Sequence, residues 1–156
     1  MFTPDLTQGN WFGEHARAYL ADGAAAHMVD LTAGGGNGPT PSLLLRTVGR
    51  KSGNTLYSPL IYGEMGDEKV LIASKGGSRR NPAWFHNLTA AAEVEFKLKD
   101  DCWRAVTRIV EGGERERMWR MMAEIYPPFD DYQAKTERHI PVIALKPIAQ
   151  IPKLSN

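Results

Sequence analysis

The chain has 156 residues, 42% of them hydrophobic and 24% charged, which is the composition of one globular domain and not of a disordered chain. Its 19 basic and 18 acidic residues leave a net charge of +1, which argues against a dedicated nucleic-acid-binding protein. The single cysteine, Cys102, allows no internal disulfide, and there is neither a transmembrane-length apolar run nor a signal peptide, so we expect a cytoplasmic protein.

The first predicted element is a helix over residues 10–28, interrupted by glycines. Residues 31–41 (LTAGGGNGPTP) are rich in glycine and proline, and we expect a flexible connection without regular structure. The chain is therefore expected to divide into an N-terminal helix and connection, residues 1–41, and a core domain, residues 42–156.

The core domain begins with a strand pattern. Residues 42–48 and 55–62 predict a hairpin around the turn GRKSGN, and residues 63–68 predict a second turn. The apolar run over residues 69–74 predicts a strand that is buried on both faces. Asn81 and Pro82 then predict the N-cap and first position of a short helix.

The second half of the chain continues with alternating residues over 94–98 and a partner strand over 102–110. A methionine stripe predicts a helix over 114–125, followed by a short helix over 130–138 and a last strand over 140–145. Because hairpins dominate this order, we predict an α+β fold with an antiparallel sheet or small barrel decorated by helices.

Two glycine-rich segments are candidate anion sites, and their basic residues all lie within residues 46–80, which hold seven basic and three acidic residues. The turn Gly49–Gly53 can form a nest of backbone N–H groups, with Lys51 as a mobile charge; the alternative is an exposed hairpin turn. The second segment, residues 73–82, joins a strand end and a Gly-Gly turn to a helix N-terminus with three cations, which favours an anion site over a mere loop.

A third segment, IYPPFDDYQ, gathers aromatic residues beside prolines, as ligand pockets often do; the alternative is a hydrophobic cap over the core. The four histidines are scattered and no HExxH or GxSxG motif is present, so we expect no metal site and no nucleophile. Anion-binding turns without acid–base machinery suggest chemistry carried by a cofactor.

These motifs, in order, resemble the family of deazaflavin-dependent nitroreductases and F420H2-dependent quinone reductases, whose members are split β-barrel reductases similar to the FMN-binding split barrels and use coenzyme F420. The resemblance covers about residues 42–147 through LLLRTVGRKSG, ASKGG, NPAWFHN, IYPPFDDYQ and TERHIPVIALKP. It implies a split β-barrel of mostly antiparallel strands and reduced F420 as the hydride donor.

The resemblance also implies which residues form the site. The cofactor-binding residues would be Arg50, Lys51, Ser52, Gly53, Pro59, Ser74, Lys75, Gly76, Trp84 and Asn87. Tyr126 and Tyr132 would lie on the substrate side, with Ser74 near the reacting ring, and these three are the candidate catalytic residues.

The function that follows is an F420H2-dependent reductase that transfers a hydride to a small-molecule acceptor, namely a quinone, nitroaromatic or conjugated enone. The alternatives are a non-catalytic F420-binding or storage module and an FMN-dependent oxidoreductase on the same fold. The aromatic N-terminal helix is open to three interpretations: a lid over the acceptor, a peripheral membrane contact, or a helix packed on the barrel. The chain is expected to be a monomer or a homodimer.

Overall fold

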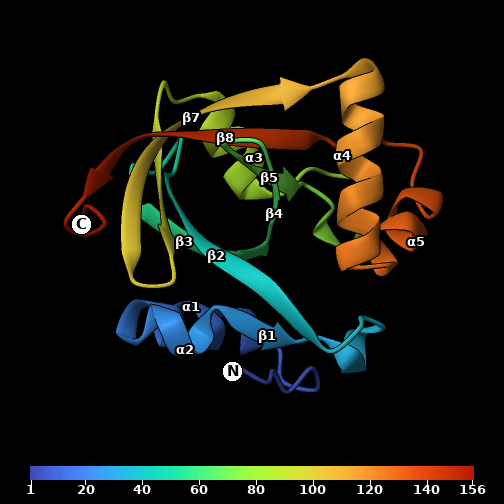
Figure 1. The fold of residues 1–156 in the computed structure, drawn as a ribbon, viewed down its shortest axis with the longest axis horizontal. Coiled ribbons are helices and arrows are strands. Elements are labelled where there is room, and N and C mark those ends of the chain that lie inside the picture. The colour runs from blue at the N-terminus through green and yellow to red at the C-terminus, as the bar shows by residue number, and fades with distance from the viewer.

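The computed structural model describes residues 1–156 and is built on one curled antiparallel sheet (Figure 1). Its eight strands are β1 (Met28–Asp30), β2 (Pro39–Val48), β3 (Thr55–Ile61), β4 (Gly63–Met65), β5 (Glu68–Ile72), β6 (Val94–Leu98), β7 (Asp101–Val110) and β8 (Val142–Ile151). The sheet order is β1-β2-β6-β7-β8-β5-β4, and β3 pairs with β2. The curl forms a half-barrel, and the predicted α+β class and split-barrel architecture are confirmed.

Five α-helices and two short 3₁₀ turns surround the sheet. They are α1 (Trp11–Ala21), α2 (Gly23–Ala26), α3 (Ala83–Thr89), α4 (Gly112–Ile125), α5 (Pro128–Ala134), η1 (Thr32–Gly34) and η2 (Lys75–Gly77). In Figure 1, α1 and α2 lie along β1 and β2, and α4 and α5 lie together at one end of the sheet. None of these helices has both the length and the apolar character needed to cross a bilayer.

The central strands are buried on both faces because the sheet lies between two apolar layers. In β5, Leu71 points into the barrel core with α3, whereas Val70 and Ile72 pack with Met118 and Met122 of α4. Successive side chains of a strand face opposite sides, so a continuous apolar run fills both layers. The predicted two-sided burial of this strand is confirmed.

The N-terminal segment is joined to the sheet by specific contacts. Tyr19 is fully buried, and its hydroxyl donates to the carbonyl of Ser42 at 2.8 Å and accepts from the Lys99 N–H at 3.0 Å. Residues 31–41 were expected to lack regular structure, which is wrong: they contain η1 and the first residues of β2, which pair with β1. The division of the chain at residue 41 stays a prediction.

Other element boundaries also differ from the sequence expectations. The expected turn over 63–68 contains β4, because Gly63 lets the strand lie under α4: a Cβ there would meet Met121 and Met122 at 2.7 Å. The expected helix over 10–28 breaks at Asp22 and ends before β1, the helix expected over 130–138 is α5, and the last strand continues to Ile151.

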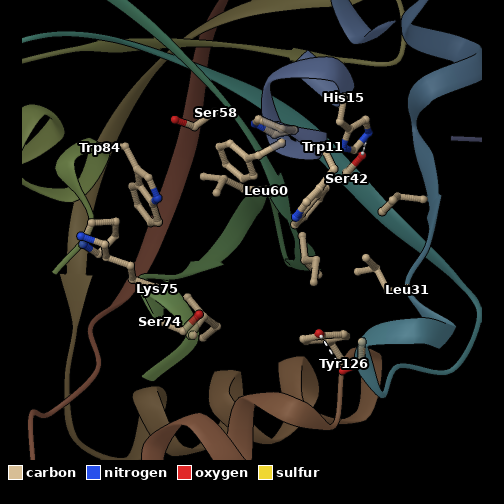
Figure 2. A pocket seen from close by; sticks show the side chains of 18 of the residues that line it. Trp11, His15, Leu31, Ser42, Ser58, Leu60, Ser74, Lys75, Trp84 and Tyr126 are labelled. Atoms are coloured by element: carbon tan, nitrogen blue, oxygen red, sulfur yellow. Dashed lines mark hydrogen bonds between the residues drawn. The ribbon is translucent and has the colours of Figure 1, made fainter. Parts of the chain in front are cut away.

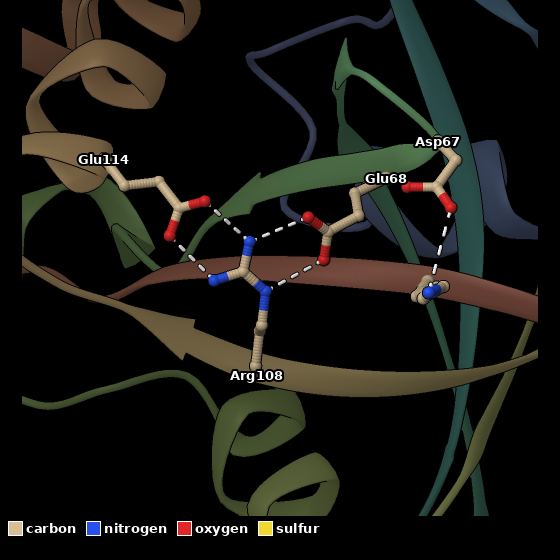
Figure 3. Close-up of polar contacts among 5 residues, drawn as sticks. Asp67, Glu68, Arg108 and Glu114 are labelled. Atoms are coloured by element: carbon tan, nitrogen blue, oxygen red, sulfur yellow. Dashed lines mark hydrogen bonds and ion pairs between the residues drawn. The ribbon is translucent and has the colours of Figure 1, made fainter.

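An ion-pair cluster links β7, β5 and α4 on the outer surface (Figure 3). Arg108 donates two hydrogen bonds to Glu68, at 2.7 and 3.0 Å, and two to Glu114, at 2.7 and 2.8 Å. The Arg108 side chain is 44% exposed, so the cluster contributes through its bidentate geometry more than through charge alone. It fixes α4 on the sheet and thereby the segment that follows α4.

Candidate functional site

The loop after β5 has an unusual backbone conformation. Lys75, Gly76 and Gly77 have φ values of +44°, +63° and +78°, in the left-handed region that favours glycine. Ser74 before them is right-handed, and this succession turns neighbouring N–H groups toward one side, as in an anion-binding nest. Gly77 has no room for a side chain, because a Cβ would lie 2.6 Å from the Tyr132 carbonyl oxygen of α5.

The hairpin turn between β2 and β3 is fixed to α3 by Asn87. This side chain is 4% exposed, accepts from the Arg50 N–H at 3.1 Å and donates to Thr47 Oγ1 at 3.3 Å. Asn87 thus orients the turn, and it does so from behind because it lines neither of the two hollows described next.

The first hollow is a largely apolar cavity of about 550 Å³ (Figure 2). It lies between β3, the loop after β5, α3, α5 and the N-terminal segment. In Figure 2, Trp84 and Lys75 lie on the side away from Trp11 and His15. The cavity therefore has one end bounded by the β5 loop and α3, and another bounded by α1.

The second hollow, of about 450 Å³, is lined mainly by arginine and lysine side chains. Its walls carry Arg50, Lys75, Arg79, Arg80, Asn81, Ala83, His86 and Arg138. None of these arginines, nor the lysine, makes an ion pair with a carboxylate of the protein. Lys75 and Ala83 line both hollows, so the apolar cavity adjoins a site with unneutralised positive charge.

The aromatic segment after α4 supplies paired phenol groups to the cavity. Tyr126 is 6% exposed, and its hydroxyl lies 3.1 Å from the Tyr132 hydroxyl and 3.4 Å from the carbonyl oxygen of Gly34. Burial, together with the hydrogen bond to Tyr132, raises the pKa of Tyr126 above its usual value. Tyr126 is therefore neutral at physiological pH and can donate a hydrogen bond, although its ring is packed in the core and not free to turn.

Eight of the twelve residues singled out from the sequence line one or both hollows. Those in the cavity are Pro59, Ser74, Lys75, Gly76, Trp84, Tyr126 and Tyr132, and those in the cation-lined hollow are Arg50 and Lys75. Lys51, Ser52, Gly53 and Asn87 line neither. Their assignment to cofactor binding stays a prediction.

The sequence analysis did not include the α1 residues Trp11 and His15, or Arg138, among the candidate site residues. Trp11 and His15, four residues apart on one face of α1, line the cavity, and the i, i+4 spacing was the available signal. Burial lowers the pKa of His15, whose Nε2 lies 3.0 Å from the Ala26 carbonyl oxygen. Arg138 belongs to the TERHIPVIALKP motif but was assigned no role, and its side chain contacts the loop after β5.

Comparison with known proteins identifies the class to which this fold and site belong. The family model described as F420H(2)-dependent quinone reductase matches residues 23–147. A putative F420H(2)-dependent quinone reductase of Mycobacterium tuberculosis is 35% identical over 109 residues, which cover 70% of this chain and 92% of that protein. A second F420H(2)-dependent quinone reductase of this organism is 35% identical over 111 residues, covering 69% and 74%.

Similar solved structures support the same class of protein. An F420-H2 dependent reductase, FDR-A, superposes with a TM-score of 0.62 and 38% identity, over 68% of this chain and 94% of that one. A structure described as a domain-swapped dimer has a TM-score of 0.65 and 32% identity, over 86% and 95%. The chain belongs to the F420H(2)-dependent quinone reductase family, and it is an oxidoreductase whose hydride donor is reduced coenzyme F420.

Proposed function

We propose that reduced F420 binds with its anionic tail in the cation-lined hollow and its ring between Trp84 and the β5 loop, facing the apolar cavity. The observation that carries this placement is that the two hollows are adjacent and share Lys75 and Ala83 as lining residues. A planar ring joined to a phosphate and carboxylates needs an apolar slot that opens into unpaired cations. The residues present therefore fit the cofactor.

The acceptor occupies the other end of the cavity, beside Trp11, His15 and Tyr126. Quinones, nitroaromatics and conjugated enones are flat apolar molecules with polar oxygens, which suits walls that are mostly apolar with a few hydroxyl groups. The bound cofactor supplies the hydride. Conversion of a quinone to a hydroquinone also consumes one proton, and this must come from the protein or from water.

Tyr126 is the proton donor in this proposal, with Tyr132 donating to it in turn. The Tyr126–Tyr132 contact of 3.1 Å is short enough for that relay, and the raised pKa keeps Tyr126 protonated. We expect Tyr126→Phe to lower kcat by about 10²–10⁴-fold with unchanged F420 affinity. Tyr132→Phe leaves the donor in place and should have a smaller effect; wild-type turnover in Tyr126→Phe with all three acceptor classes would assign the proton to water.

The test of the proposed function is a titration of F420 and FMN followed by turnover with menadione. Tail binding by exposed cations predicts tighter binding of F420 than of FMN, and affinity that falls with salt as the Debye length shrinks from about 10 Å at 0.1 M to about 3 Å at 1 M. Consumption of reduced F420 in the presence of menadione supports catalysis, whereas binding without consumption supports a storage module. Equal or tighter FMN binding would favour an FMN enzyme.

The acceptor is a small molecule, and the protein acts on it as a monomer or a homodimer. One of the similar structures is described as a domain-swapped dimer, which favours the homodimer. Light scattering of the purified protein distinguishes the two.

A further inference from the structure

Arg138 makes an unusual set of hydrogen bonds to the loop after β5. The residue lies between α5 and β8, and the loop is 57 to 65 residues away in the sequence. Its guanidinium donates from Nε to Ser78 O at 3.0 Å, from Nη1 to Ala73 O at 3.0 Å and Asn81 Oδ1 at 2.6 Å, and from Nη2 to Ser74 O at 2.7 Å. Four of the five N–H groups of this side chain are therefore used on a single loop.

These bonds hold the loop on both sides of its strained part. Two of the acceptor residues, Ala73 and Ser74, precede the segment Lys75–Gly77. The other two, Ser78 and Asn81, follow it. A lysine at positive φ is unfavourable and persists only where the surroundings enforce it. Two backbone hydrogen bonds within the loop also stabilise this conformation. Gly77 N donates to Ser74 O at 2.9 Å, and Ser78 N donates to Lys75 O at 3.2 Å.

The same bonds explain why the helix α3 begins later than the sequence suggests. Asn81 was expected to cap this helix, but its side-chain oxygen accepts from Arg138 instead, and Pro82 occupies the N-cap position. The expected cap is thus replaced by a long-range contact that belongs to the loop.

Arg138 has no carboxylate partner, although it lines the cation-lined hollow. An arginine in this position could act as a charge for the ligand or as a clamp on the loop. The geometry favours the clamp, because a planar fork can reach several carbonyl oxygens at once and a lysine ammonium cannot. One N–H remains for a ligand, against four that are used within the protein.

We propose that Arg138 is a positioning residue that holds the Ser74–Gly77 loop in the conformation that binds the cofactor and presents Ser74 to the cavity. The proposal concerns the same site and rests on the proposed function. It assigns to Arg138 a role in preorganisation, since a loop that is already ordered binds without a further entropy cost.

The test compares Arg138→Lys, which keeps the charge, with Arg138→Met, which removes it. Arg117→Lys is the matched control, because Arg117 is exposed, lines neither hollow and makes no side-chain hydrogen bond or ion pair in the protein. We expect both Arg138 variants to raise the F420 dissociation constant about tenfold or more, and Arg117→Lys to change it less than about twofold. Affinity near the wild-type value in Arg138→Lys, with loss in Arg138→Met, would show that the charge matters and overturn the clamp.

Hydrogen exchange without cofactor gives an independent readout. The amides of Gly77 and Ser78 should exchange about tenfold faster or more in Arg138→Lys, while those of β5 and β8 keep their protection, which separates local loosening from unfolding. Unchanged exchange of these amides would also overturn the proposal. If wild-type protein fails to bind F420 while the exchange result holds, the proposed function fails and the clamp stands.

A milder variant keeps the test valid if the Arg138 variants do not fold. Asn81→Ala removes one of the four acceptors and leaves Arg138 in place. It should give an intermediate rise in both the exchange rate and the F420 dissociation constant, and no change in either would contradict the clamp.

Discussion

Lys75 and Lys51 are both expected from the sequence to hold the cofactor tail, and the structure separates them. Lys75 stands where the apolar cavity meets the cation-lined hollow, whereas Lys51 lines neither. Both side chains are exposed. Replacing each by alanine thus compares two exposed lysines from the same basic part of the chain, only one of which touches the proposed site.

The expected magnitude follows from what each ammonium can contact. A hydrogen bond to a charged group contributes about 1.5–3 kcal/mol, and we take the lower end because water screens Lys75. Lys75→Ala should therefore raise the F420 dissociation constant about tenfold. Lys51→Ala removes only screened, longer-range attraction of about 0.5 kcal/mol or less, which is about twofold.

Alanine is the right replacement at position 75 because it keeps the Cβ. The backbone at φ +44° is equally strained in both proteins, so the difference reports the ammonium group and not the loop. Fluorescence titrations at about 0.05 M and about 0.5 M salt measure the F420 dissociation constant of each variant. The ratio of the dissociation constants of Lys75→Ala and the wild type should be smaller at the higher salt. Equal losses in the two variants, or none in Lys75→Ala, would refute the placement of the tail.

Three further predictions concern the loop, the acceptor end of the cavity and alkaline pH. Gly76→Ala meets open space and should cost about 1–2 kcal/mol for its positive φ alone, whereas Gly77→Ala also collides with the backbone of α5 and should cost about 3 kcal/mol or more, as urea unfolding measures. Trp11→Ala should raise the KM for menadione about tenfold without changing F420 affinity, while Leu20→Ala, which is 41% exposed and outside the cavity, should change neither. Burial raises the pKa of Tyr62 to about 12, so the unfolded chain loses this proton first. Between pH 10 and pH 12, Tyr62 alone should lower the free energy of unfolding by about 1.4 kcal/mol per pH unit, so the decline measured for Tyr62→Phe should be shallower than that of the wild type by this amount.

The parts of the fold that were predicted correctly depend on local patterns. The alternation in β6, the turn that joins it to β7 and the methionine stripe of α4 are all encoded within a few residues of each element. β1 and β4 were missed because three-residue strands carry no period of their own. They exist because distant partners, β2 and β5, supply their hydrogen bonds.

The site, too, has parts that a local sequence pattern predicts and parts that depend on distant contacts. The glycine-rich loop and the aromatic segment were visible as motifs, and the resemblance to a family supplied the cofactor, which no spacing of residues could name. Asn87 shows the limit of this reasoning: it belongs to a predicted motif, but its amide holds the hairpin turn from behind. Whether a motif residue faces a ligand or supports one that does depends on tertiary contacts.

Lys75 has an unfavourable backbone conformation that destabilises the fold but places its ammonium group at the proposed cofactor site. Glycine would occupy φ +44° without strain, as Gly76 and Gly77 do at the neighbouring positions, and a lysine there costs about 1 kcal/mol in backbone energy. No contact of the Lys75 side chain offsets that cost, because the ammonium forms neither a hydrogen bond nor an ion pair with any other residue. The strain instead places a free positive charge at the junction of the two hollows, where a ligand with both a ring and an anionic group would meet it. Arg138 and the packing of Gly77 against α5 then have to keep the loop in place, so the residues that bear the strain and those that enforce it form one unit.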